Sequence, residues 1–134
     1  MEILTNCDVV ASIGSQDYHF DDVDTVAIDD PRTNQLTRGM NAKNKVGFVV
    51  EQNTDQPTVI TTTLKNLDDN TSDVLKDAYK NKTRFDFNVI NSSSGKKKYA
   101  KNCIVAENPI QRTIGVDTDS YNMDLVLQTY DYTD

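Results

Sequence analysis

The sequence predicts a mainly β protein, an antiparallel β-sandwich or barrel of about eight strands with one short α-helix. Short apolar runs and runs of period-2 alternation dominate it, residues typical of turns separate these runs, and a single stretch has helical periodicity. A chain of 134 residues fits one domain with one hydrophobic core, so we expect residues 1–134 to fold as a unit.

Eight segments have the apolar pattern of strands. In order, they are Asp8 to Ile13, Tyr18 to Ile28, Val46 to Gln52, Thr58 to Leu64, Arg84 to Ile90, Tyr99 to Ala106, Gln111 to Val116 and Tyr121 to Tyr132. Gly14 with Ser15, the run from Asn53 to Pro57, and the Ser-rich stretch ending at Gly95 supply turns between them.

The run Arg84 to Ile90 alternates most cleanly. Phe85, Phe87 and Val89 share one face, while polar side chains occupy the other. The start of Tyr121 to Tyr132 alternates in the same way, with Met123, Leu125 and Leu127 on one face. Each of these strands therefore has one face in the core and one in water.

One helix is expected at residues 72–80. Its apolar stripe consists of Val74, Leu75 and Ala78. Asn70 or Thr71 is placed to cap its first N–H groups, and Lys80 lies at its negative end. We expect this helix to pack on or beside the antiparallel sheet.

A long polar loop is expected from Asp29 to Lys45, between two runs that both have the strand pattern. Loops of this length are uncommon in compact domains and usually have a function or are disordered. Basic and isolated apolar residues are mixed in it: Arg32, Leu36, Arg38, Met40, Lys43 and Lys45. Gly39 permits a positive φ or a close backbone approach. We expect this segment to be an arm that contacts another molecule.

The chain is acidic, with a formal charge of −7 and a pI near 4.6. General nucleic-acid binders gain most of their affinity from Lys and Arg on phosphates, so this charge argues against one. An acidic wall past which DNA only moves is compatible with it. Glu51, Asp86 and Asp124 fall in strand interiors on or near polar faces, where they line either an ordinary solvated sheet or a water-filled channel.

The inventory of catalytic and metal-binding residues is poor, and we expect neither an enzyme nor a cofactor. His19 is the one histidine, and no nucleophile motif accompanies it. The pairs Asp22/Asp24 and Asp117/Asp119 lack the further ligands of an EF-hand loop. We expect them to be solvated carboxylates.

The one dense basic cluster consists of Lys96, Lys97, Lys98 and Lys101. Since only Tyr99 offers a stacking platform among them, a phosphate site is the weaker interpretation. A solvated hairpin, or a charge partner for an acidic neighbouring subunit, fits the cluster better.

Cys7 and Cys103 lack the close spacing of a zinc site. Buried free thiols are the favoured interpretation, with a disulfide within or between subunits as the alternative. The N-terminal segment has no basic region followed by an apolar run, and no stretch has the length of a membrane span. We therefore expect a cytoplasmic chain without a membrane partner.

Taken in order, these segments resemble the small tail tube proteins of tailed bacteriophages, over nearly the whole chain. The sequence has a short N-terminal strand, a hairpin, the long loop with LTRGMNAKNK, the strands VGFVVEQ and TVITTTLKN, the helix TSDVLKDAYKNK, the hairpin RFDFNVIN-SSSG-KKKYAKNCIVAE and the final strand YNMDLVLQTYDY. The L-x-R-G stretch before a strand, and the helix that leads to an F-x-F strand, contribute most to the resemblance.

The resemblance implies a structural virion protein in which the inner sheets of six copies join into one closed barrel. The hexameric rings then stack into a tube that conducts genomic DNA without binding it specifically. The same fold serves type VI secretion tubes and contractile-bacteriocin tubes. The implied partners are other copies and the tail sheath, baseplate and tail terminator proteins, with assembly in the host cytoplasm and a final place in the phage tail.

Two sets of site residues follow from the resemblance. Contacts between rings or subunits are expected at Arg32, Leu36, Arg38, Gly39, Met40 and Lys43. Candidate lumen residues are Glu51, Asp86 and Asp124. The alternative function is a monomeric β-sandwich binding module, for example for carbohydrate, and the absence of Trp argues against its aromatic platform.

Overall fold

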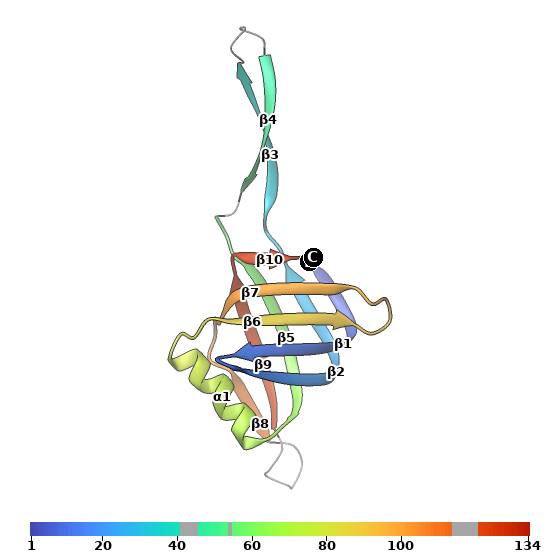
Figure 1. The fold of residues 1–134 in the computed structure, drawn as a ribbon, viewed down its shortest axis with the longest axis vertical. Helices are drawn as coiled ribbons and strands as arrows, with labels where there is room; N and C mark the ends of the chain where they lie inside the picture. Colours follow the sequence, from blue (N-terminus) through green and yellow to red (C-terminus); the bar gives the residue numbers. More distant parts are fainter. Residues whose placement is uncertain (41–45, 54, 114–120) are drawn as a thin grey trace.

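The computed structural model describes residues 1–40, 46–53, 55–113 and 121–134, and its main body is a closed antiparallel barrel (Figure 1). Its six strands follow one another around the barrel as β1 (Glu2–Ile13), β2 (Gln16–Asp29), β5 (Thr58–Leu67), β9 (Tyr121–Thr129), β7 (Lys97–Val105) and β6 (Phe85–Asn91). The short pairing of β7 with β9 closes the ring. The predicted class, mainly antiparallel β with one helix, is confirmed, with ten strands in the described residues instead of about eight.

Bulges bend the barrel strands. β5 has one extra residue opposite β9 between Leu64 and Leu67, and β7 has one extra residue opposite the segment from Phe85 to Phe87. Asn66 and Asn102 lie in these bulges with φ angles of 57° and 51°. Asn tolerates this left-handed conformation better than most residues. The sequence therefore places a suitable residue where the strands must turn around a small barrel.

The barrel interior is filled with side chains, as expected for a small barrel. The alternation predicted for β6 is confirmed, because Phe85, Phe87 and Val89 are all at most 4% exposed. Cys7 and Cys103 are free and fully buried, which confirms the favoured interpretation of the thiols. Burial raises the pKa of the Cys103 thiol to about 12, so it stays protonated in the core.

Helix α1 spans Asp69–Lys80, three residues longer at its start than the predicted helix. The N-cap is Asp68, and the expectation of Asn70 or Thr71 was wrong. The Asp68 carboxylate accepts the Thr71 N–H at 2.8 Å, which satisfies one of the first free donors. Leu75 and Ala78 join the barrel core, so the helix packs on the barrel beside β7 and β9.

Two short strands extend the barrel sheet. β8 (Ile110–Thr113) pairs with β9, and β10 (Asp131–Thr133) pairs with β7. β8 covers the start of the expected strand from Gln111 to Val116, whose last residues lie outside the described part. The expected long last strand is divided into β9 and β10.

The segment expected to be a loop contains a strand. β3 (Thr33–Met40) pairs with β4 (Val46–Asn53) in a separate two-stranded sheet, so the prediction of a loop over Asp29 to Lys45 was wrong for most of its length. A strand that faces no core needs no apolar face, and its polar sequence gave no sign of it. Residues 41–45 lie outside the described residues.

Candidate assembly surfaces

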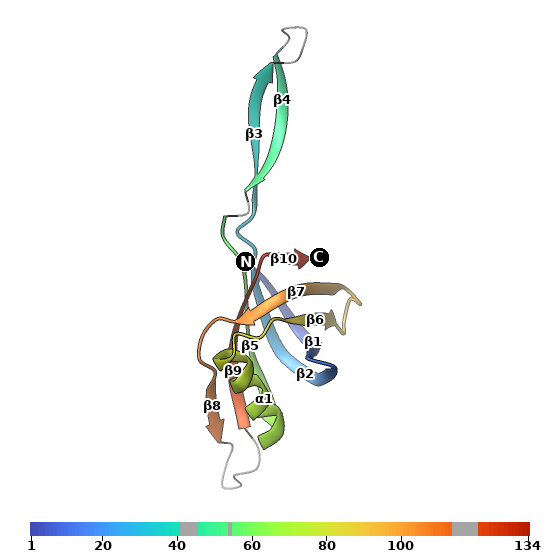
Figure 2. The same ribbon diagram turned by 60° about the vertical axis from the view of Figure 1, so that its left-hand side comes forward.

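The β3–β4 hairpin, which we call the arm, projects from the barrel (Figures 1 and 2). Its pairing runs without a register shift from Thr33 opposite Asn53, at the base, to Met40 opposite Val46. In the part of the chain that the structure describes, no barrel strand pairs with either arm strand. Both backbone edges of the arm are therefore available to another chain.

The predicted contact residues are distributed along this arm. The Leu36 side chain is 63% exposed on β3, whereas Arg38, Gly39 and Met40 occupy the end of β3 that is farther from the barrel. Lys43 lies outside the described residues. Arg32 precedes the arm and lies at its base.

The two ends of the arm are joined at the base by Asp30. Both Asp30 carboxylate oxygens accept hydrogen bonds from the Arg32 guanidinium, from Nε at 2.8 Å and from Nη2 at 2.6 Å. The Thr58 hydroxyl donates to Asp30 at 3.3 Å, and Thr58 is the first residue of β5. Asp30 thus links the chain that enters the arm with the chain that leaves it.

Next to this pair lies a charged cluster around the C-terminal strand. The Arg32 guanidinium carbon is 5.7 Å from the centre of the Tyr132 ring, within the range of a cation–π contact. The Tyr132 hydroxyl donates to Asp134 at 2.7 Å, and Lys98 Nζ lies 3.0 Å from the same carboxylate oxygen and 3.2 Å from Glu2 Oε1. The cluster therefore joins both ends of the chain to the base of the arm.

Electrostatics within the cluster favour the charged forms of its ion-paired members. The hydrogen bonds from Tyr132 and Lys98 lower the pKa of Asp134. Burial by itself would lower the pKa of Lys98, but Asp134 and Glu2 outweigh it and the pKa rises. Hydrogen bonding from Arg32 likewise lowers the pKa of Asp30. The Asp30 and Asp134 carboxylates and the Lys98 ammonium group therefore stay ionised at neutral pH.

This cluster was not predicted from the sequence. Lys98 was grouped with solvated lysines, yet it is only 8% exposed. One signal was present, because period-2 alternation in β7 places Lys98 on the same face as buried Ala100. Its partners lie at opposite ends of the chain, where spacing carries no information.

The three acidic residues predicted to line a lumen are not brought together. Glu51 lies on β4, in the arm. Asp86 lies on β6, where it accepts the Asn102 N–H at 3.3 Å. Asp124 lies on β9, where it accepts the Thr63 hydroxyl at 2.8 Å.

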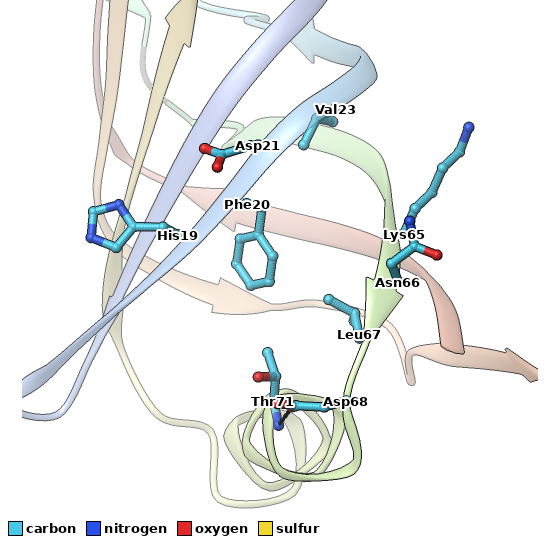
Figure 3. A pocket seen from close by; sticks show the side chains of 9 residues that line it. All are labelled: His19, Phe20, Asp21, Val23, Lys65, Asn66, Leu67, Asp68 and Thr71. Atoms are coloured by element: carbon cyan, nitrogen blue, oxygen red, sulfur yellow. Dashed lines mark hydrogen bonds between the residues drawn. The ribbon is translucent and has the colours of Figure 1, made fainter. Parts of the chain in front are cut away.

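A cavity of about 320 Å³ lies between β2, the end of β5 and the start of α1 (Figure 3). Phe20 and Leu67 point toward its centre, while the Lys65 side chain points away and its ammonium group pairs with Asp24. Asp68 is occupied as the helix cap. The full lining is His19, Phe20, Asp21, Val23, Lys65, Asn66, Leu67, Asp68 and Thr71.

The described residues contain no group of three or more His, Cys, Asp or Glu side chains that is arranged to hold a metal ion. No helix among them is both long enough and apolar enough to cross a membrane.

No protein-family model and no curated protein matches the chain. Ten chains of solved structures match it, and three of them, each at 10% identity, are as follows. A chain of the PVC sheath–tube complex, an extracellular contractile injection system in its extended state, has a TM-score of 0.49 over 93% of this chain and 86% of its own. A chain of the anti-feeding prophage baseplate has a TM-score of 0.46 over 99% of this chain and 94% of its own. A chain of the native gene transfer agent virion has a TM-score of 0.48 over 95% of this chain and 96% of its own.

These three structures agree with the resemblance inferred from the sequence.

Proposed function

We propose that this chain is a structural virion protein, a tail tube subunit whose copies form hexameric rings. Stacked rings build the tube through which genomic DNA passes into the host, and the DNA is not bound specifically. The implied partners are further copies and the sheath, baseplate and terminator proteins of a tail. Subunits assemble in the host cytoplasm and end in the virion.

The arm is the observation that carries this proposal. It is an isolated pair of strands that extends from a barrel whose core is already complete. A two-stranded hairpin alone is marginally stable in water at best. Packing against another subunit supplies the missing burial and strand partners, and Leu36 offers that subunit an exposed apolar side chain.

A second observation supports ring formation. Within the described residues, β2 from Gln16 to Thr25 pairs with β1 alone, because β5 joins β2 only from Val26 onward. Asp17 and Asp21 lie along this open edge and are exposed, while exposed Lys97 lies on β7 at the other side of the same sheet, before the stretch from Tyr99 to Lys101 that β10 covers. Edges of opposite charge favour a head-to-tail contact between copies, and such a contact builds a ring when the rotation that relates the copies closes on itself.

Charge supports the passive role toward DNA. Six copies with a formal charge of −7 each give a ring of about −42. Phosphates are repelled by such a surface, so DNA moves through the tube without being held.

Removal of the arm tests the proposal. A deletion of Thr33 to Asn53, with a short Gly-Ser bridge, takes out both arm strands and leaves the Asp30–Thr58 link at the base. Negative-stain electron microscopy and light scattering of the purified protein are expected to show rings or tubes for the unmodified chain. The deletion variant is expected to fold and to fail to form tubes.

Thr61→Ala is the matched control, since Thr61 is exposed on β5, away from the arm, and should assemble normally. A strictly monomeric unmodified chain at all concentrations and salt strengths would contradict the proposal. So would tubes of normal length from the deletion variant.

A further inference from the structure

We infer that the C-terminal residues Tyr132 and Asp134, with Arg32 and Lys98, form a latch that fixes the arm at one angle to the barrel. These are positioning residues that act within one subunit. Arg32, expected from the resemblance to contact another ring, is assigned here to its own chain. The inference concerns the arm of the proposed tube subunit, but its test does not require assembly.

The arm has few covalent connections to the barrel. The chain enters the arm after β2 and returns to the barrel at β5, so the arm is joined to the barrel covalently only at these two points. Two strands joined at one end form a natural hinge unless side chains fix them. Whatever sets the angle of the arm must therefore act at its base.

Side-chain contacts hold the base of the arm against the barrel. The two-pronged contact between Arg32 and Asp30 fixes the guanidinium plane. This holds the guanidinium over the Tyr132 ring, which is itself only 4% exposed. Because β10 pairs with β7, the ring belongs to the rigid barrel. A swing of the arm would have to break the cation–π contact.

Further contacts hold the Tyr132 ring in place from behind. Asp134 receives both the Tyr132 hydroxyl and the buried ammonium of Lys98, whose second partner is Glu2 on β1. The orientation of the Tyr132 ring is therefore set through Asp134 by groups on two barrel strands, Lys98 on β7 and Glu2 on β1. On the other side of the base, the Tyr130 hydroxyl donates to the Asp55 carbonyl at 3.4 Å, next to the returning chain.

The latch also encloses space. A cavity of about 260 Å³ lies among Met1, Glu2, Ile28, Asp30, Tyr132 and Asp134. Its walls are mostly polar and charged side chains, so the cavity is suited to water. The base is therefore held by directional hydrogen bonds and ion pairs, with little dense apolar packing. The angle of the arm should become less restricted when one of these contacts is lost.

Distance measurements between spin labels test the latch. One label is attached at Leu36→Cys on the arm and one at Thr61→Cys on the barrel, both exposed positions. Cys7 and Cys103 are fully buried and remain in place, and labelling of the parent chain checks that they do not react. Dilution with unlabelled protein restricts the signal to pairs within one subunit.

We expect a narrow distance distribution in the parent chain and at least a doubling of its width in Arg32→Gln and Tyr132→Leu. Lys97→Gln is the matched control, since it removes an exposed cation from β7 and should leave the width unchanged. Arg32 is partly exposed, so its variant should keep the fold even if Tyr132→Leu loses stability, and circular dichroism checks both.

A distance distribution of the parent chain as broad as those of Arg32→Gln and Tyr132→Leu would overturn the inference. Distributions of the two variants as narrow as that of the parent chain would overturn it as well. The measurement is made on single subunits. Distance distributions that contradict the latch, in a chain that still forms tubes, would overturn this inference alone. Distributions that support the latch, in a chain that forms no tubes, would contradict the proposed function alone.

Discussion

Tyr132 connects the charged cluster at the base of the arm with the barrel. Burial raises the pKa of its phenol above the ordinary value of about 10, and the hydrogen bond to Asp134 adds to the shift. In the unfolded chain the phenol ionises near pH 10, while in the fold it stays protonated beyond that pH. Its contribution to stability is therefore complete below about pH 10 and is lost as the pH rises further.

Alkaline titration should detect this tyrosine. At about pH 11, the folded parent chain and Tyr132→Phe should show the same tyrosinate absorbance, because Tyr132 is still protonated. After unfolding in guanidinium at the same pH, the parent should show one tyrosinate more than the variant. A difference of one tyrosinate already present between the folded proteins would mean that Tyr132 ionises in the native state.

Within helix α1, Ser72 is fully buried and its hydroxyl has no hydrogen-bond partner among the described residues. A buried polar group without a partner lowers stability, and Ala is the better helix former. We expect Ser72→Ala to raise the free energy of unfolding by up to about 1 kcal/mol in urea denaturation. Leu75→Ala, one turn further along the same buried face, should lower it by about 2–5 kcal/mol.

If Ser72→Ala lost as much stability as Leu75→Ala, the hydroxyl would have a role in the core that its geometry does not explain. A modest gain in the free energy of unfolding of Ser72→Ala would instead show that α1 stabilises the protein mainly through its apolar contacts.

The barrel strands and the helix were predictable because each has an apolar face against a core. Phe85, Phe87 and Val89 on β6 illustrate this, since their alternation alone placed them inside. The arm strand β3 has no such face, so its sequence resembled a loop. Its pairing with β4 supplies the hydrogen bonds that define it, and pairing is not visible in a single polar segment.

The latch was still less predictable. Glu2, Arg32, Lys98 and Asp134 are far apart in the sequence and meet only because the barrel closes and β10 folds back onto β7. Of the predicted contact residues, Leu36, Arg38, Gly39 and Met40 lie on the projecting arm, and their role in contacts between subunits stays a prediction.

Across the whole molecule, the barrel has two walls whose outer faces point in different directions, one with β6 and β7 and the other with β5 and β9. β6 and β7 run across β5 and β9 in Figure 1, and Phe87 on β6 and Leu125 on β9 are buried in the same core between them. Asp86 and Asp124, on the polar faces of these two strands, therefore point outward from different walls of the barrel. One wall alone can line a tube lumen.

We expect that wall to be the one with Asp86, because its sheet also has the open β2 edge that a neighbouring copy can extend. In particles assembled from variant subunits, Asp86→Lys should lower genome delivery by about tenfold or more, since a ring of added cations attracts the DNA backbone. Asp124→Lys is the matched control and should deliver normally. Electron microscopy must show intact tubes for both variants. The opposite order, or equal losses, would place a different wall in the lumen.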